Sequence, residues 1–156
     1  MFMASHEKST LNDLIATTFD SIDGYLDAAK NSESDRLVAL FDQRVIERRA
    51  VIDLLRREVI RLDGKPQDDG SLSASAHRMF FNLKSAVTGR DEQAIVDEVE
   101  KGEDHITARF EDAMADTELS PEVQRTIREC HASIRQGHDQ MRDLKQTMPA
   151  AQTPSA

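Results

Sequence analysis

The sequence has no tryptophan, and it contains only one tyrosine, one cysteine and four prolines among 156 residues. Aromatic residues are enriched in β-strands and proline breaks regular elements, so this scarcity favours a protein rich in helix and poor in strands. The single cysteine, Cys130, excludes a disulfide within this sequence and a zinc site made of cysteines. Its apolar neighbours at helical spacing, Ile127 and Ile134, predict a buried small side chain.

Long apolar segments and excess positive charge are also missing. No stretch approaches the roughly 20 apolar residues of a membrane-spanning helix. The first ten residues, MFMASHEKST, lack the apolar run of a signal peptide. The net charge of −9 and the pI of about 5.0 argue against binding to nucleic acid or to an anionic membrane surface, because both attract clustered Lys and Arg. We therefore expect a cytoplasmic protein.

Five stretches of the sequence repeat apolar residues at steps of three and four, which is the spacing of one helix face. They predict helices at about 10–30, 35–62, 72–87, 92–116 and 121–147. Ser34 or Asp35 can cap the start of the second stretch, and Ser120 followed by Pro121 is a start signal for the last. Gly64 is a candidate C-terminal cap after the second stretch.

The lengths of the connections predict how these helices are arranged. The first two helices are joined by a short link, as are the last two, so each pair is expected to be antiparallel. About thirty residues separate the pairs and contain the short predicted helix. This is the ferritin-like four-helix bundle, with an extra short helix in the long crossover; an up-and-down array of five helices is the competitor. We expect one domain, 10–147, with flexible tails at 1–9 and 148–156.

The di-metal centre that ferritin-like bundles hold needs Glu-x-x-His on each of two helices, and this motif is missing. The chain has five histidines, namely His6, His77, His105, His131 and His138. The residues three positions before them are Met3, Ala74, Gly102, Arg128 and Arg135, and none of these is acidic. The sequence therefore predicts the scaffold without the ligands of that centre.

Polar side chains interrupt the apolar helix faces. Projection at about 100° per residue places Arg44 and Arg48 inward on the second helix, Glu103 on the fourth and His138 on the last. Because buried charges are normally paired, we expect a structural polar layer in which Arg44 or Arg48 pairs with Glu103. The sequence does not tell which arginine makes the pair. Two cations beside one central acid would repel a divalent metal ion.

A mononuclear metal site is the alternative interpretation of the same region. Its ligands would be Glu103 and His138, together with His131 near the edge of the last helix and Glu47 at the margin of the second. Such mixed His and carboxylate ligands suit iron or zinc. A third, weaker hypothesis is a small-molecule site in which the two arginines hold a carboxylate or phosphate. No Ser-His-Asp arrangement, phosphate-binding glycine loop or nucleotide fingerprint occurs, which favours a protein that is not an enzyme.

Several short segments are similar to those of a known family. They are Leu11-Asn12-Asp13-Leu14-Ile15, Asp23-Gly24-Tyr25, Arg44, Gly64-x-Pro66 with Gly70-Ser71, His77-Arg78, Leu83-Lys84, Thr88-Gly89-Arg90-Asp91, Glu100-x-Gly102-Glu103-Asp104 and His138-Asp139. Together they resemble a bacterial family of ferritin-like four-helix bundles of unknown function, over about residues 11–144. The resemblance implies the fold and supplies no activity.

Two functions follow as expectations. The first is a non-enzymatic bundle that acts through a protein partner or through self-association, and that binds neither nucleic acid nor membrane. A role in stress responses rests on the resemblance alone. The second is a metal-binding protein with a degenerate or mononuclear iron or zinc site in the bundle core. The missing Glu-x-x-His motifs favour the first, and the inward Glu103 and His138 favour the second.

Overall fold

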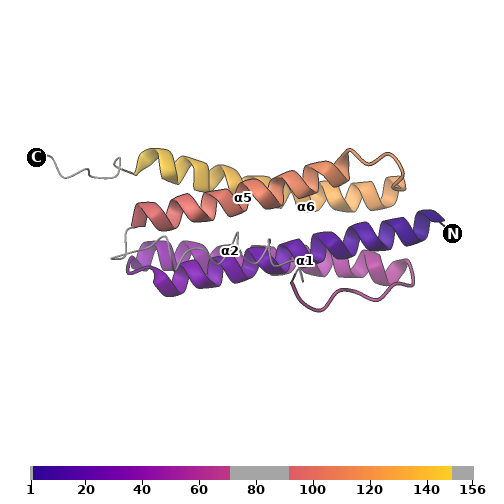
Figure 1. Cartoon of the computed structure of the whole chain (residues 1–156), viewed down its shortest axis with the longest axis horizontal. Helices are drawn as coiled ribbons and strands as arrows, with labels where there is room; N and C mark the ends of the chain where they lie inside the picture. The colour runs from indigo at the N-terminus through magenta and orange to yellow at the C-terminus, as the bar shows by residue number, and fades with distance from the viewer. Residues whose placement is uncertain (1, 71–91, 149–156) are drawn as a thin grey trace, which may run out of the picture.

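The computed structural model of the chain describes residues 2–70 and 92–148. Within these ranges it contains four α-helices and no strand: α1 (Phe2–Asn31), α2 (Asp35–Arg61), α5 (Glu92–Met114) and α6 (Pro121–Thr147) (Figure 1). The prediction of an all-α protein is confirmed. None of the described helices is both long enough and apolar enough to cross a membrane. The predicted helix at 72–87, the Thr88-Gly89-Arg90-Asp91 segment and the predicted tail from 149 onward lie outside the described residues.

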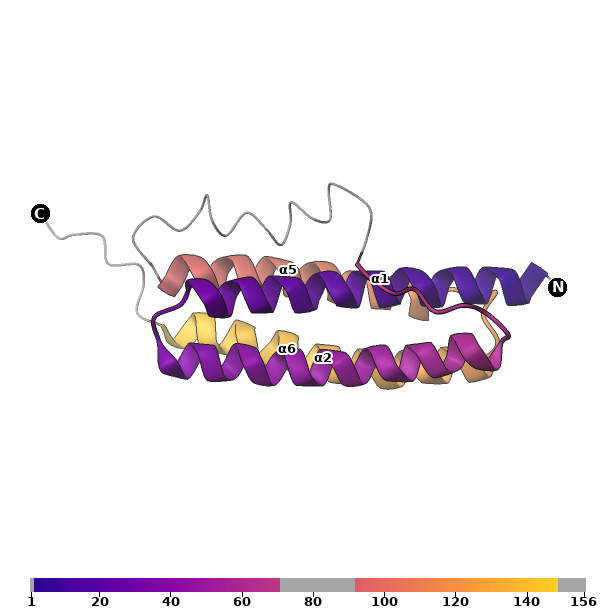
Figure 2. The same cartoon turned by 90° about the horizontal axis from the view of Figure 1, so that it is seen from below.

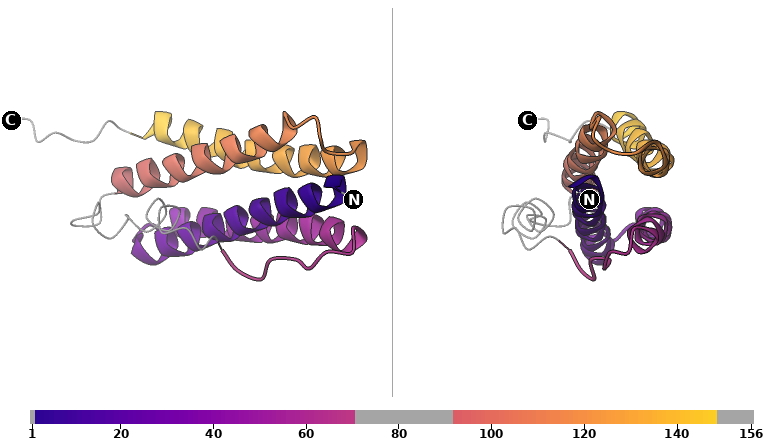
Figure 3. Two further views of the ribbon diagram at one scale, coloured as in Figure 1. Left: turned by 45° about the vertical axis from the view of Figure 1, so that its right-hand side comes forward. Right: turned by 90° about the vertical axis from the view of Figure 1, so that its right-hand side faces the viewer.

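The helices form two antiparallel hairpins, α1 with α2 and α5 with α6, that pack side by side (Figures 1 and 3). Helix α1 lies beside α5, and α2 lies beside α6, so the four helices close into one bundle. In a sequential up-and-down array these cross-pair contacts would not form. Helices α2 and α5 run in the same direction, which explains the long connection between them. The predicted ferritin-like arrangement is therefore the observed one.

Serine caps fix the starts of two helices where the sequence predicted them. The Ser34 hydroxyl accepts a hydrogen bond from the Leu37 N–H (3.2 Å) at the start of α2. The Ser120 hydroxyl accepts one from the Val123 N–H (3.4 Å) at the start of α6, where proline occupies the first turn. Each cap satisfies a backbone donor that the helix itself leaves without a partner.

Helix α1 begins earlier than the sequence suggested. The expected tail of residues 1–9 belongs to α1 from Phe2 onward. Glu7 is only 4% exposed, and its carboxylate accepts a hydrogen bond from the Ser120 N–H (2.8 Å) across the bundle. The first nine residues carry no apolar stripe that would predict this helix. A polar contact to a distant loop anchors its first turns instead.

The end of α2 also differs from expectation. Asp63, and not Gly64, adopts the left-handed conformation there, with φ of 61°. The Gly64 N–H then donates to the Val59 carbonyl (2.8 Å), which closes the last turn. The chain next runs back over α1 (Figure 2). There the Asn12 amide donates to the Lys65 carbonyl (3.1 Å) and accepts from the Gln67 N–H (2.8 Å), so one side chain holds this segment on α1.

A continuous apolar core fills the bundle along its length. Fully buried members from all four helices include Leu11, Ile15, Phe41, Leu55, Ile95, Ile106, Phe110, Ile127, Ile134 and Met141. Cys130 is among the fully buried residues, as predicted, and burial raises the pKa of its thiol to about 12. The core is therefore an ordinary apolar one except at a layer of charged side chains.

Candidate functional site

The charged layer is centred on an ion pair that joins the two hairpins. Arg48 of α2 donates from Nη2 to Glu103 Oε2 of α5 over 2.7 Å, and the two side chains are 0% and 1% exposed. The other terminal nitrogen, Nη1, donates to the Ser21 hydroxyl of α1 (2.9 Å). Of the two arginines that the sequence placed inward, Arg48 is thus the one that pairs with Glu103.

Arg44 lies one turn before Arg48 and is equally buried, at 1% exposure. Its Nη1 donates to Glu47 Oε1 of the same helix over 2.8 Å, and its Nη2 donates to Gln140 Oε1 of α6. Glu47 is 30% exposed, so this pair reaches the edge of the bundle. From the sequence, Glu47 was proposed only as a possible metal ligand. In the structure its carboxylate pairs with the guanidinium group of Arg44.

Tyr25 of α1 also belongs to the layer, and its ring lies close to both guanidinium groups. The central carbons of Arg44 and Arg48 lie 5.9 and 5.7 Å from the centre of its ring, within the range of a cation–π contact. Burial raises the pKa of Tyr25 well above its ordinary value, and nearby Glu103 raises it further, so the phenol is neutral. The layer therefore holds two positive charges against Glu103 inside and Glu47 at the edge.

Gly137 of α6 leaves the space that the arginines occupy. A Cβ atom at this position would lie 2.8 Å from Arg44 Nη1 and 2.8 Å from Arg48 Nη2, closer than such contacts allow. All four helices thus contribute to a closely packed layer. Because it contains two guanidinium groups and only one fully buried carboxylate, it does not fit the di-metal centre of ferritin-like bundles, which needs several anionic ligands.

The structure does not bring together the four residues that the sequence proposed as metal ligands. Glu103 pairs with Arg48, and Glu47 pairs with Arg44. His131 Nε2 lies 3.5 Å from Glu111 Oε2. The fourth residue, His138, contacts acids on two helices, with Nε2 2.6 Å from Asp104 Oδ1 and Nδ1 3.2 Å from Asp139 Oδ1. Each proposed ligand therefore has a different partner.

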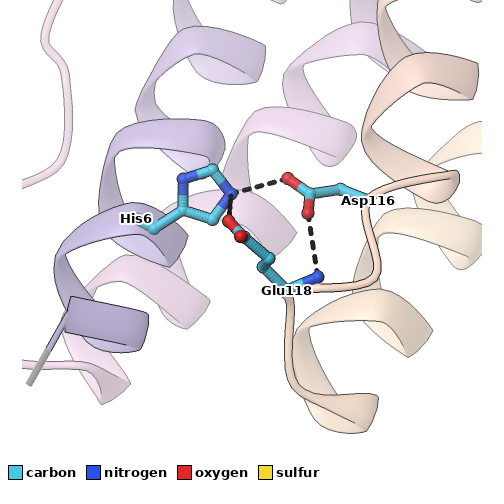
Figure 4. A group of neighbouring side chains, drawn as sticks. All are labelled: His6, Asp116 and Glu118. Atoms are coloured by element: carbon cyan, nitrogen blue, oxygen red, sulfur yellow. Dashed lines mark hydrogen bonds and ion pairs between the residues drawn. The ribbon is translucent and has the colours of Figure 1, made fainter.

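A group of possible metal ligands lies at the end of the bundle, where α1 begins (Figure 4). His6 Nε2 is 2.6 Å from Asp116 Oδ2 and 3.7 Å from Glu118 Oε2, and one ligand atom from each of the three residues lies within 4.8 Å of the others. Within 2–70 and 92–148 this is the one such group. The sequence alone does not reveal this group, because His6 lies in a segment expected to be a tail and its partners lie about 110 residues away.

Two cavities lie on the surface of the bundle, near its ends. One of about 200 Å³ lies between α1 and α5 and is lined by Thr10, Asp13, Leu14, Arg109, Asp112, Ala113 and Asp116. It therefore shares Asp116 with the histidine cluster. The other, of about 220 Å³, lies at the opposite end of the bundle and is lined by Ser34, Arg36, Leu37, Glu92, Leu144, Thr147 and Met148. Neither cavity reaches the arginine layer.

Comparison with known proteins agrees with the fold. A family model described as "Domain of unknown function (DUF2383)" matches residues 6–116. No curated protein sequence matches the chain. One similar solved structure is a two-domain protein from Anabaena variabilis with DJ-1/ThiJ/PfpI-like and ferritin-like domains, with 18% identity and a TM-score of 0.75. The match covers 95% of this chain but only 41% of that protein, so the chain spans less than half of its length.

Two further structures match over most of their own length. A dodecameric thioferritin, the bacterioferritin-related protein of Bacteroides fragilis, has 16% identity and a TM-score of 0.69, with 90% of this chain and 84% of that one covered. Dps from Thermosynechococcus elongatus has 12% identity and a TM-score of 0.72, with 99% and 98% covered. At such low identities these likenesses establish the ferritin-like fold and nothing about activity.

Proposed function

The chain belongs to the family described as domain of unknown function (DUF2383), and we propose that this member is a ferritin-like bundle without catalytic activity that acts through self-association. The observation that carries the proposal is the arginine layer. In the bundle centre, where this fold builds its metal chemistry, Arg44, Arg48 and Glu103 are packed against one another. Because the centre is occupied in this way, we place the function on the surface of the bundle.

The outer face of α2 supports self-association. Ile46 and Ile60 are 62% and 59% exposed, and they lie about four helical turns apart on one side of the helix. Small or charged residues, Ala50, Asp53 and Arg57, lie between them on the same side and are exposed. A two-fold dimer pairs the same surface of two copies, so one such stripe provides both halves of an interface. The assembly of the B. fragilis thioferritin into a dodecamer is a precedent within the fold.

The test is the mass of the full chain in solution, by light scattering after size-exclusion chromatography and by native mass spectrometry. We expect the wild type to be an oligomer and the double variant Ile46→Glu, Ile60→Glu to have a lower mass. Leu26→Glu is the matched control, because Leu26 is an exposed apolar residue (43%) on α1 and not on this stripe. A monomeric wild type, or equal effects of both changes, would contradict the proposal.

A second candidate function is metal binding, and it is favoured by the group of His6, Asp116 and Glu118. The set proposed from the sequence, Glu103, His138, His131 and Glu47, stands as a weaker form of the same idea, because each of its members already has another partner. The cytoplasmic location, the bacterial origin and the role in stress responses stay predictions from the sequence.

A further inference from the structure

We infer that His6, Asp116 and Glu118 form a binding site for one first-row divalent metal ion, Fe²⁺ or Zn²⁺, where the start of α1 meets the loop between α5 and α6. This inference gives a location to the second candidate function and does not depend on self-association. It also moves the metal chemistry out of the bundle centre, to the end of the molecule.

The distances suit a single ion. Bonds of about 2.0–2.2 Å to nitrogen and oxygen place the donors of one ion roughly 3–3.5 Å apart. Here the imidazole nitrogen of His6 lies 2.6 Å from Asp116 Oδ2 and 3.7 Å from Glu118 Oε2. Entry of an ion requires the first distance to widen by less than an ångström, roughly, and the second to shorten slightly. The Glu118 side chain is 76% exposed and can turn toward the ion without disturbing the core.

The charge at this site also suits a divalent cation. Two carboxylates and one neutral imidazole carry a charge of −2, which one such ion would balance. In the described part of the chain, His6 is the one basic side chain within ion-pair distance of Asp116 or Glu118. The arginine layer is the opposite case, since each of its carboxylates already has a guanidinium partner. A nitrogen donor with two carboxylate oxygens is a set that suits iron or zinc.

Neighbouring groups hold Asp116 in place for this role. Its Oδ1 accepts a hydrogen bond from the Glu118 N–H (2.9 Å), which leaves Oδ2 directed at His6. Its backbone carbonyl accepts from the Gln124 side chain (3.0 Å). The bond from Ser120 to Glu7 then ties the loop to the residue next to His6. Partners of this kind orient metal ligands and are part of a working site.

Solvent has access to the cluster, and its surroundings are acidic. His6 is 39% exposed and Asp116 is 24% exposed, so water can reach the remaining coordination positions of an ion. The cavity of about 200 Å³ beside Asp116 adds Asp13 and Asp112 to the carboxylates near the site, with Arg109 as the one basic residue of its lining. A concave surface with excess negative charge raises the local concentration of cations.

Without a metal, the same contacts make an ion pair between protonated His6 and Asp116. That pair would connect α1 to the loop and do nothing more, so the experiment has to separate the two roles. If the contact is only an ion pair, replacing His6 removes its contribution to stability, and the wild type binds no metal. If it is a metal site, the wild type takes up one ion per chain and releases protons or water as it does so.

The test uses the full chain without a histidine tag, freed of metal by chelator, and titrated calorimetrically with Zn²⁺ and, under anaerobic conditions, with Fe²⁺. We expect about one ion per chain for at least one metal, and an affinity at least tenfold weaker in His6→Asn and in Glu118→Gln, because losing a direct ligand should cost no less than the roughly 10–100-fold that losing a partner of a ligand costs. His105→Asn is the control, because His105 lies on α5 and belongs to neither proposed set of metal ligands. It should bind as the wild type does.

Thermal melting gives an independent measurement. Metal should raise the melting temperature of the wild type and of His105→Asn, because an ion that binds only the folded chain stabilises it. It should not raise that of His6→Asn, whose fold is checked by circular dichroism. Wild-type protein that takes up no metal, or His6→Asn protein that binds as tightly as the wild type, would overturn the inference. The mass of the metal-free protein, measured in parallel, tests self-association separately.

Discussion

Arg48 of α2 and Glu103 of α5 form an ion pair of 2.7 Å in which neither side chain has more than 1% of its surface exposed. Their helices belong to different hairpins, so the pair fixes how the two halves of the bundle lie against each other. Burying two charges costs several kcal/mol each before their attraction is counted. The pair therefore sets the position of the two hairpins relative to each other and adds little net stability.

Removal of one partner of this pair should be strongly destabilising. We expect Glu103→Ala to lower the free energy of unfolding by about 3–5 kcal/mol, because it leaves Arg48 buried without its carboxylate. The measurement is chemical denaturation followed by circular dichroism. Glu122→Ala is the control, since its pair with Arg61 is exposed and such pairs contribute at most about 1 kcal/mol. Equal, small effects of the two changes would contradict the importance of the buried pair.

The close contact of Gly137 with the arginines predicts that alanine is harmful there. Alanine normally stabilises a helix interior by about 1 kcal/mol relative to glycine. In Gly137→Ala the new Cβ would lie 2.8 Å from both guanidinium groups. These groups are buried and hydrogen-bonded to side chains on α1, α2, α5 and α6, so moving them aside breaks contacts, and we expect a loss of about 1–3 kcal/mol instead. The measurement is chemical denaturation, and the sign of the change in the free energy of unfolding distinguishes the two outcomes. A more stable Gly137→Ala variant would mean that the arginines can move aside freely.

His138 predicts a pH dependence of stability. Burial lowers the pKa of His138, but the contacts with Asp104 and Asp139, with Glu103 nearby, outweigh burial and raise the pKa above its ordinary value. Protonated His138 therefore favours the folded state. Its contribution is fully present below the unfolded pKa of about 6.5 and is lost as the pH rises through the folded value. The difference in melting temperature between wild type and His138→Asn should shrink as the pH rises above about 6.5. A difference in melting temperature that does not change with pH would argue against a stabilising role of protonated His138.

Asp63 predicts a simple route to a more stable protein. Its φ of 61° is unfavourable for a residue with a side chain, by roughly 1–2 kcal/mol in general and less for Asp. We expect Asp63→Gly to raise the free energy of unfolding by about 0.5–1 kcal/mol, because glycine is the usual residue at this position after a helix. Asp68→Gly, a nearby exposed change, should give no gain. Thermal melting of the two variants makes the comparison.

The helices could be predicted from sequence because the apolar residues repeat at helical spacing and because Ser34 and Ser120 provide local start signals. The start of α1 could not, since Glu7 is held by a contact to Ser120, which lies 113 residues further along the chain. The choice between Arg44 and Arg48 depended on a shift of one helical turn along the same stripe. Local patterns do not determine such a shift; it depends on how α2 packs against α1 and α5, where Arg48 meets Ser21 and Glu103.

The histidine cluster shows the same limit for function. Neither His6 nor Glu118 belongs to a motif with recognisable spacing, and their neighbourhood arises only when the bundle closes. The absence of Glu-x-x-His concerns the usual metal centre of the fold. It carried no information about the end of the bundle, where the candidate ligands meet.

The buried ion pair also has a consequence for the order of folding. Arg48 and Ser21 lie within one hairpin, so their hydrogen bond can form as soon as α1 and α2 pair. Glu103 is 55 residues away from Arg48 and arrives only with the second hairpin. Both charges are therefore fully desolvated only when the two hairpins pack together. Interactions made after the transition state mainly control the rate of unfolding. We therefore expect loss of the pair to speed unfolding of the bundle more than it slows folding.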